Sequence, residues 1–157
     1  LVFTTDALAH DTEDDGEPMV ELHVSADVAA LDYHVYLSEV DENGRSTRIT
    51  EGAMRASHRT LGDAPYDNVG APFAVSTREA ILAAAPLNNG DTHVLKFALL
   101  PVGNIFDRGH RIRLSIVHAD QGNSANIVPE QVVTTRIHAG KLTPSKVLLP
   151  ALKARPN

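Results

Sequence analysis

The stretch from 107 to 126, DRGHRIRLSIVHADQGNSAN, contains the side-chain types of a serine-hydrolase triad within twenty positions. The candidates are His110, His118, Asp120 and Ser124. A serine hydrolase uses a histidine base to activate a serine hydroxyl, and an acidic residue to orient that histidine. These residue types therefore point to nucleophilic catalysis, provided that the chain brings them together.

The segment 111–118 alternates apolar and polar residues, which predicts a strand between two of the candidates. A strand rises about 3.3 Å per residue, so we expect His110 and Ser124 to lie about 20 Å apart. His118 is nearer to Ser124, but it follows the apolar face of the strand, and we predict a hydrogen-bonded histidine at the border of the core. Ser124 lies in Gly-Asn-Ser-Ala-Asn, which lacks the second glycine and the strand–turn–helix setting of a nucleophile elbow. We predict no catalytic residue in this chain.

The acidic run HDTEDDGE (10–17) imitates the start of a calcium-binding loop. The residues that match are Asp11, Glu13, Asp15 and Gly16. The position of the bidentate glutamate would be occupied by Leu22, which cannot supply a carboxylate. We predict a solvated turn between strands, with a weak cation site of another geometry as the alternative.

The remaining histidines are scattered singly along the chain, without an HExxH motif. Zinc needs three or four converging ligands, and the chain contains no cysteine. Neither GxxxxGK[ST] nor GxGxxG occurs, so we expect no nucleotide, no metal and no other cofactor. These histidines are His10, His23, His34, His58, His93 and His138.

Composition narrows the classes of partner. The chain has 157 residues, 43% of them hydrophobic, and a formal net charge of −6. A negative chain without a Lys/Arg run is repelled by a phosphate backbone, so we do not expect nucleic-acid binding. No segment approaches the roughly 20 apolar residues of a membrane span. We expect a soluble protein, whether in a bacterial cytoplasm or exported. The opening LVFTTDAL resembles neither an initiator segment nor a signal peptide, and it suggests a piece of a longer protein or a processed product.

Period-two alternation dominates the sequence and predicts about eight short antiparallel strands. Asn43-Gly44 marks a hairpin, because both residues tolerate positive φ. Gly52, inside a predicted strand, indicates a bulge or a close backbone approach. The predicted strands cover 19–27, 32–40, 46–59, 92–101, 111–118, 131–138 and 145–152.

One helix is predicted near 76–85, where Ser76 and Glu79 fit a capping box and Pro86 ends the element. It follows a long loop, 61–73, of a kind that is usually functional or part of an interface. Short strands, many turns and almost no helix predict an all-β fold, a jelly-roll β-sandwich formed by residues 1–157 as a single domain.

The order of these segments resembles the C-terminal non-catalytic domain of X-prolyl dipeptidyl-peptidases and cocaine-esterase-like (CocE/NonD) serine hydrolases. The resemblance rests on TEGAMRAS (50–57), NIFDRGHRIRL (104–114) and the closing RIHAGKLTPSKVLLPAL, and it spans nearly the whole chain. APYDNVGAPF within the long loop is similar to one subgroup of the family. The sequence departs from many members at SIVHADQGNSANIVP and at TPSKV (143–147).

The resemblance implies a galactose-binding-like jelly roll that packs on an α/β-hydrolase domain of the same polypeptide and helps to wall its active site. The triad of such enzymes lies in that other domain, so no catalytic residue is carried over to this chain. The parent would act on esters or Xaa-Pro peptides, and homodimer contacts are possible. The alternatives are a carbohydrate- or ligand-binding module, for which Tyr66 and Phe73 are the only plausible aromatic platform, and an oligomerisation module.

Overall fold

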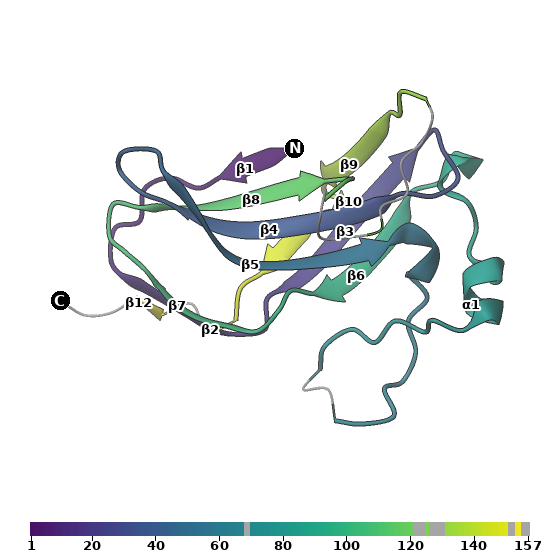
Figure 1. Cartoon of the computed structure of the whole chain (residues 1–157), viewed down its shortest axis with the longest axis horizontal. Coiled ribbons are helices and arrows are strands. Elements are labelled where there is room, and N and C mark those ends of the chain that lie inside the picture. The colour runs from purple at the N-terminus through teal and green to yellow at the C-terminus, as the bar shows by residue number, and fades with distance from the viewer. Residues whose placement is uncertain (68–69, 121–124, 126–130, 151–152, 155–157) are drawn as a thin grey trace.

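The fold is a sandwich of two antiparallel sheets, seen in the computed structural model of the chain, which describes residues 1–67, 70–120, 125, 131–150 and 153–154 (Figure 1). The first sheet has the strand order β1-β8-β4-β5. Its strands are β1 (Val2–Thr4), β8 (Arg111–Val117), β4 (Asp32–Val40) and β5 (Ser46–Arg55).

The second sheet has the order β10-β9-β3-β11, and β6 pairs with the other side of β3. Its strands are β10 (Thr143–Pro144), β9 (Thr135–Gly140), β3 (Met19–Ala26), β11 (Lys146–Leu148) and β6 (His93–Ala98). A third, small sheet at one end of the sandwich has the order β12-β2-β7. It comprises β12 (Lys153–Ala154), β2 (Thr12–Gly16) and β7 (Val102–Phe106).

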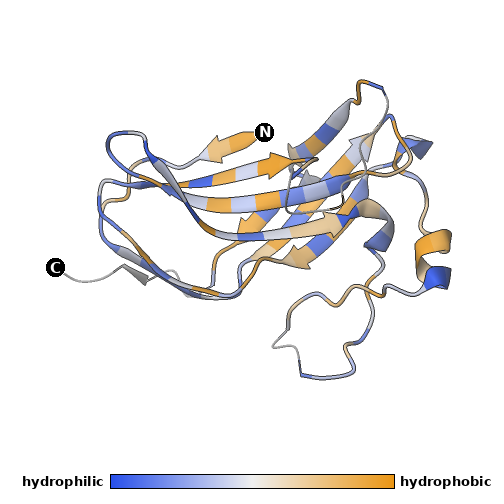
Figure 2. Ribbon diagram, in the orientation of Figure 1, coloured by the Kyte–Doolittle hydropathy of each residue, from blue (hydrophilic) through white to orange (hydrophobic). Residues whose placement is uncertain are grey.

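The core lies between the two large sheets and consists of the residues that alternate inward. Figure 2 shows the resulting stripes of apolar and polar residues along the strands. Each large apolar side chain buried there stabilises the fold by about 1.5–3 kcal/mol. On the apolar faces that the alternation predicts for these strands, Leu114 and His118 are partly exposed. The other predicted inward residues are buried, namely Val20, Leu22, Val24, Tyr33, Val35, Leu37, Leu95, Phe97, Leu99, Ile112 and Ile116.

The predicted hairpin joins β4 to β5. Gly44 has a φ of 84°, in the region that favours glycine. The Asp41 carboxylate accepts hydrogen bonds from the backbone N–H groups of Asn43 and Arg45, at 2.9 and 2.8 Å. The aspartate therefore holds the turn that sets the register of the two longest strands.

Gly52 is a point of close backbone approach rather than the site of a bulge. A Cβ atom at this position would lie 2.7 Å from the carbonyl oxygen of Ala98. The irregularity of the β4–β5 ladder falls instead between Leu37 and Ser38. Gly52 therefore lets β5 cross the end of β6 without a steric clash.

Four predicted strands are shorter than expected, and the one predicted over 92–101 is reduced to β6. The strand predicted over 46–59 ends at Arg55, because the chain continues as a 3-10 helix, Ala56–His58. Ala56, the first residue of this helix, is fully buried and donates its N–H to the carbonyl oxygen of Leu31. The strand predicted over 131–138 begins only at Thr135, and Val132 is 96% exposed. The strand predicted over 145–152 is reduced to β11.

The predicted helix exists as α1 (Arg78–Ala83), but Thr77 rather than Ser76 is its N-cap. The Thr77 hydroxyl oxygen accepts a hydrogen bond from the N–H of Ala80 at 3.2 Å. A second 3-10 turn, Leu87–Asn89, follows. In the part of the chain that the structure describes, no helix has the length and apolar character needed to cross a membrane.

The prediction of a solvated turn at 10–17 is wrong. Residues Thr12–Gly16 form β2, which pairs with β7 along its whole length. Because β2 is paired with β7 as a strand, its alternate side chains face the protein interior. Thr12 is therefore 7% exposed, and Asp14 is fully buried. The run lacks the apolar alternation that marks a strand, which is why the sequence pattern did not indicate one.

Candidate functional site

The two histidines among the triad candidates do not lie together. His110 and His118 lie beyond opposite ends of β8, and each has its own partner. The His110 Nδ1 atom is 2.9 Å from Glu39 Oε1. The His118 Nδ1 atom donates to the carbonyl oxygen of Asp32 at 2.8 Å, because a carbonyl can only accept. Ser124 lies outside the described residues.

His118 is the hydrogen-bonded histidine at the core border that the strand pattern predicted. Its ring packs edge-on against Tyr33, with 4.7 Å between the ring centroids and 84° between the planes. The bond to Asp32 places a proton on Nδ1 and fixes the tautomer. His118 therefore joins the end of β8 to the start of β4, which is a structural role.

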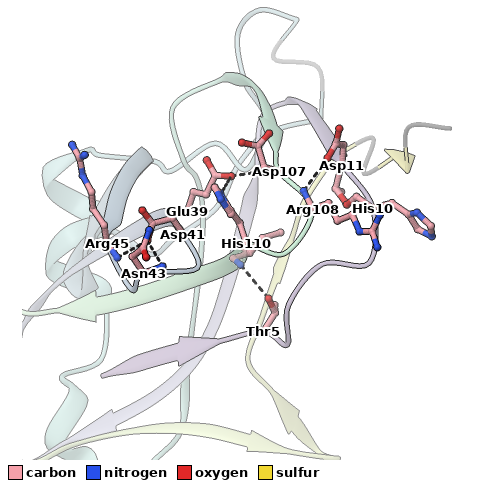
Figure 3. A network of polar contacts seen from close by, with 12 residues as sticks. Thr5, His10, Asp11, Glu39, Asp41, Asn43, Arg45, Asp107, Arg108 and His110 are labelled. Carbon is pink, nitrogen blue, oxygen red and sulfur yellow. Dashed lines mark hydrogen bonds and ion pairs between the residues drawn. The ribbon is translucent and has the colours of Figure 1, made fainter. Parts of the chain in front are cut away.

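A polar network ties the β7–β8 turn to the end of β4 (Figure 3). Glu39 Oε1 accepts from the backbone N–H of Asp107 at 2.9 Å and contacts His110 Nδ1 at the same distance. Nearby, the N–H of Arg108 donates to Asp11 Oδ1 at 2.9 Å. The turn is thus held from two sides by carboxylates.

Electrostatics favour the charged form of His110. The hydrogen bond to Glu39 raises the pKa of His110 above its ordinary value, against the opposing effect of burial. The charges of Glu39, Asp107 and Asp41 act in the same upward direction. One ligand-type atom from each of Glu39, Asp107 and His110 lies within 4.8 Å of the others, a spacing that a metal ion could bridge. Since Glu39 Oε1 already accepts from two donors, we assign the cluster a structural role.

The calcium-loop pattern does not form an ion-binding loop. Asp14 points into the protein, whereas Glu13 and Asp15 alternate with it on the extended strand β2. A calcium loop must curl so that successive oxygens face one ion. In β2 the acidic side chains are divided between two faces instead.

Three of the other described histidines make separate local contacts, whereas the Nε2 atom of buried His34 has no hydrogen-bond partner among the described residues. His93 is buried; its Nδ1 accepts from the Arg59 guanidinium at 3.2 Å and its Nε2 donates to Asn89 at 3.0 Å. Burial and the Arg59 charge lower the pKa of His93. His23 contacts Glu21, and His138 contacts Ser25. These residues do not form the converging set that zinc requires.

A cleft of about 390 Å³ lies beside Tyr36 on the outer side of the first sheet. Burial, followed by the hydrogen bond and charge of Asp120, raises the pKa of Tyr36 to about 12, so this phenol stays protonated near neutral pH. The Arg48 guanidinium lies 5.4 Å from the centre of the Tyr36 ring and 2.7 Å from Glu51. Tyr36, an aromatic residue on the polar face of a strand, was the signal in the sequence that could have indicated this cleft.

Tyr66 and Phe73 do not form a flat platform for sugar stacking. Their ring centroids are 6.0 Å apart and their planes meet at 88°, an edge-to-face pair. A stacking platform presents the faces of its rings to the ligand. This pair thus gives no specific support to a carbohydrate-binding module.

The fold and these local contacts define a class of protein, an antiparallel β-sandwich domain of the jelly-roll type whose polar clusters hold strands and turns together. Residues 1–148 match the family described as the X-Pro dipeptidyl-peptidase C-terminal non-catalytic domain. The chain belongs to this family.

Curated relatives are much longer than this chain. A protein of Mycobacterium bovis (strain ATCC BAA-935 / AF2122/97), provisionally designated a serine esterase, is 36% identical over 155 residues; the match covers 98% of this chain and 24% of that protein. A Mycobacterium tuberculosis protein with the same designation gives the same values. Cocaine esterase from Rhodococcus sp. (strain MB1 Bresler) is 21% identical over 165 residues, covering 98% of this chain and 25% of that enzyme. The chain thus spans about a quarter of the length of the curated relatives it matches.

Solved structures share the fold. A CocE/NonD family hydrolase from Staphylococcus aureus superimposes with a TM-score of 0.73 at 19% identity, covering 98% of this chain and 30% of that one. An α-amino acid ester hydrolase gives a TM-score of 0.72 at 20% identity, covering 99% of this chain and 25% of that one.

Proposed function

We propose that residues 1–157 form one accessory domain of a serine hydrolase, whose catalytic α/β-hydrolase domain belongs to the same polypeptide and acts on esters or Xaa-Pro peptides. One observation carries this proposal: a non-catalytic domain family matches 1–148, while the relatives at 36% identity are about four times as long as the matched part. The domain would stabilise the catalytic domain and restrict access to its pocket.

The long loop and α1 support a role in packing against another domain. They project from the sandwich as a separate excursion (Figure 1). None of the residues of α1 is buried, and Leu82 is 73% exposed. A six-residue helix is not stable on its own in water, so a further surface that covers it would explain its presence.

The base of the excursion is firmly attached to the sandwich. The Arg59 guanidinium donates to the carbonyl oxygens of Ala56 at 2.8 Å and Ala85 at 2.6 Å, and so joins its two ends. A fixed base with an exposed apolar tip suits an element that packs on a neighbouring domain. If the backbone amides of 78–83 exchanged at equal rates in the isolated chain and in the full-length hydrolase, α1 would not be part of this interface.

Ester turnover tests the proposal directly. We expect the purified 157-residue chain to leave a p-nitrophenyl ester intact, and the product of the complete reading frame to hydrolyse it. The control is Ser124→Ala, which should leave the full-length activity unchanged because the nucleophile belongs to the other domain. Turnover by the isolated chain that Ser124→Ala abolishes would overturn the proposal. A homodimer stays a prediction that light scattering after size-exclusion chromatography can test.

A further inference from the structure

On one side of the sandwich, both large sheets end in a short strand. In the part of the chain that the structure describes, β1 pairs only with β8, and β11 pairs only with β3. The two strands lie near each other, because side chains around both line the same cleft. Among the described residues, the sandwich is therefore open along this side.

The backbone of β1 presents hydrogen-bonding groups to that open side. The backbone nitrogen of Leu1 donates to the carbonyl oxygen of Ile116, and the N–H of Ile116 donates to the carbonyl oxygen of Leu1, both at 2.8 Å. The N–H of Thr5 donates to the carbonyl oxygen of Ile112 at 3.0 Å. In an antiparallel ladder, alternate residues bond to the same neighbour. The N–H and C=O groups of Val2 and Thr4 therefore point away from β8.

The exposed edge is apolar. Leu1, Val2 and Phe3 are 63%, 57% and 48% exposed. The strand has neither the proline nor the charged side chain with which natural proteins usually protect an edge from pairing. An edge of this kind is suited to pairing with a further strand.

A cleft of about 220 Å³ opens between the sheets beside β1. The Phe3 side chain lies on its inner face, opposite Leu114 in the β1–β8 register. Alternate side chains of a strand added to β1 would point into this cleft. Its apolar lining consists of Phe3, Leu37, Ile112, Leu114, Val147 and Leu149.

We propose that the β1 edge and this cleft bind an extended apolar segment from the remainder of the hydrolase polypeptide, which adds to β1 as a strand. This inference rests on the proposed function. The solved relatives supply the argument for the occupant, since only 25–30% of their chains corresponds to this one. A segment in the same polypeptide is present at a high effective concentration.

A second copy of the chain fits this edge less well. Two β1 strands of three residues each would share few hydrogen bonds. A stable association of separate chains usually buries at least about 1,200 Å². A single connected segment needs no such area.

Hydrogen exchange on the full-length hydrolase and on the isolated 157-residue chain tests the inference. We expect the amide of Thr4 to exchange at least about tenfold more slowly in the full-length protein, because a partner strand would accept its bond. The amide of Val35, in the middle of β4, is the internal control and should be protected similarly in both.

Phe3→Asp is the matching variant, because it places a charge in the cleft. In the full-length hydrolase it should return the exchange of Thr4 to the rate seen in the isolated chain. The control is Ile105→Asp on β7, where the side chain is 38% exposed but lies outside the cleft. This variant should leave the exchange of Thr4 unchanged.

Equal exchange of Thr4 in an active full-length hydrolase and in the isolated chain would overturn the inference and leave the proposed function intact. If the amide of Thr4 in the isolated chain became more protected as the protein concentration rose, the edge would bind a second copy of the chain. That result would also overturn the inference. A reading frame without a hydrolase domain would overturn both proposals.

Discussion

His110 and Glu39 are 71 residues apart in the chain, yet His110 Nδ1 lies 2.9 Å from Glu39 Oε1. The contact exists because β4 and β8 are neighbours, with Val40 opposite Arg111 in their register. Glu39 also accepts from the N–H of Asp107, so a single carboxylate holds both ends of the β7–β8 turn. The conspicuous histidine of the GHRIRL segment thus serves the fold.

The His110–Glu39 pair predicts a dependence of stability on pH. Because the folded-state pKa of His110 is raised above 6.5, its stabilising effect is complete below that value and is lost as the pH rises through the folded-state pKa. Glu39→Gln should lower the pKa of His110 in an NMR titration and weaken this loss of stability in urea unfolding. Glu79→Gln, on the distant helix α1, is the control. An unchanged His110 titration in Glu39→Gln would contradict the prediction.

Asp14 predicts a stabilising substitution. Its carboxylate is fully buried, and neither oxygen has a hydrogen-bond partner within the described ranges. Burial, aided by the charge of Asp15, raises the pKa of Asp14 above 3.8, so the charged form opposes folding. Stability should therefore be higher below pH 3.8, as far as this group is concerned, and should fall as the pH rises through the folded-state pKa.

Asp14→Asn should therefore raise the free energy of unfolding at pH 7 by about 1–3 kcal/mol, since it replaces a buried charge with a neutral group of the same shape. Asn104, its neighbour in the β2–β7 register, offers the new amide a partner. Asp15→Asn, on the exposed face of β2, is the comparison variant: it removes the neighbouring charge but leaves the buried carboxylate, and should raise stability by less than about 0.5 kcal/mol. Urea unfolding measures both, and a destabilised Asp14→Asn protein would count against the prediction.

Gly52→Ala should destabilise the fold by about 1–3 kcal/mol. The added Cβ would lie 2.7 Å from the Ala98 carbonyl oxygen and 3.0 Å from the Leu99 Cα, so the backbone would have to move. Gly103→Ala is the matched strand control, because the nearest atom, Asp15 Oδ1, is 3.8 Å away. Thermal unfolding should separate the two variants; similar midpoints would show that the crossing of β5 and β6 is not tightly packed.

Sequence patterns indicated the strands whose outer and inner faces differ in polarity. The alternation of 19–27 and 32–40 predicted β3 and β4 with the correct faces inward. Asn43-Gly44 correctly indicated the hairpin between β4 and β5. The patterns failed for β2, where acidic residues fill a strand. They also failed for β1, which is too short for alternation to be recognised.

The rise of a strand was sufficient to predict that His110 lies far from the residues that follow 111–118, and β8 does separate His110 from His118. The absence of a triad in 107–126 stays a prediction. The family resemblance likewise depends on short motifs that can be recognised along the chain. Alternating hydropathy and turn-forming residues depend only on residues a few positions apart, so both signals can be recognised from the sequence alone.

The partners of individual side chains depend on strand pairing instead. Glu39 beside His110, Asp14 beside Asn104 and the open cleft at β1 all arise where segments distant in sequence become neighbours. Many strand orders satisfy the same alternation pattern, and only the packed arrangement selects which polar groups meet. The identity of the strands therefore follows from local periodicity, whereas the polar network, the buried acid and the unpaired edge follow from their order in the folded sheets.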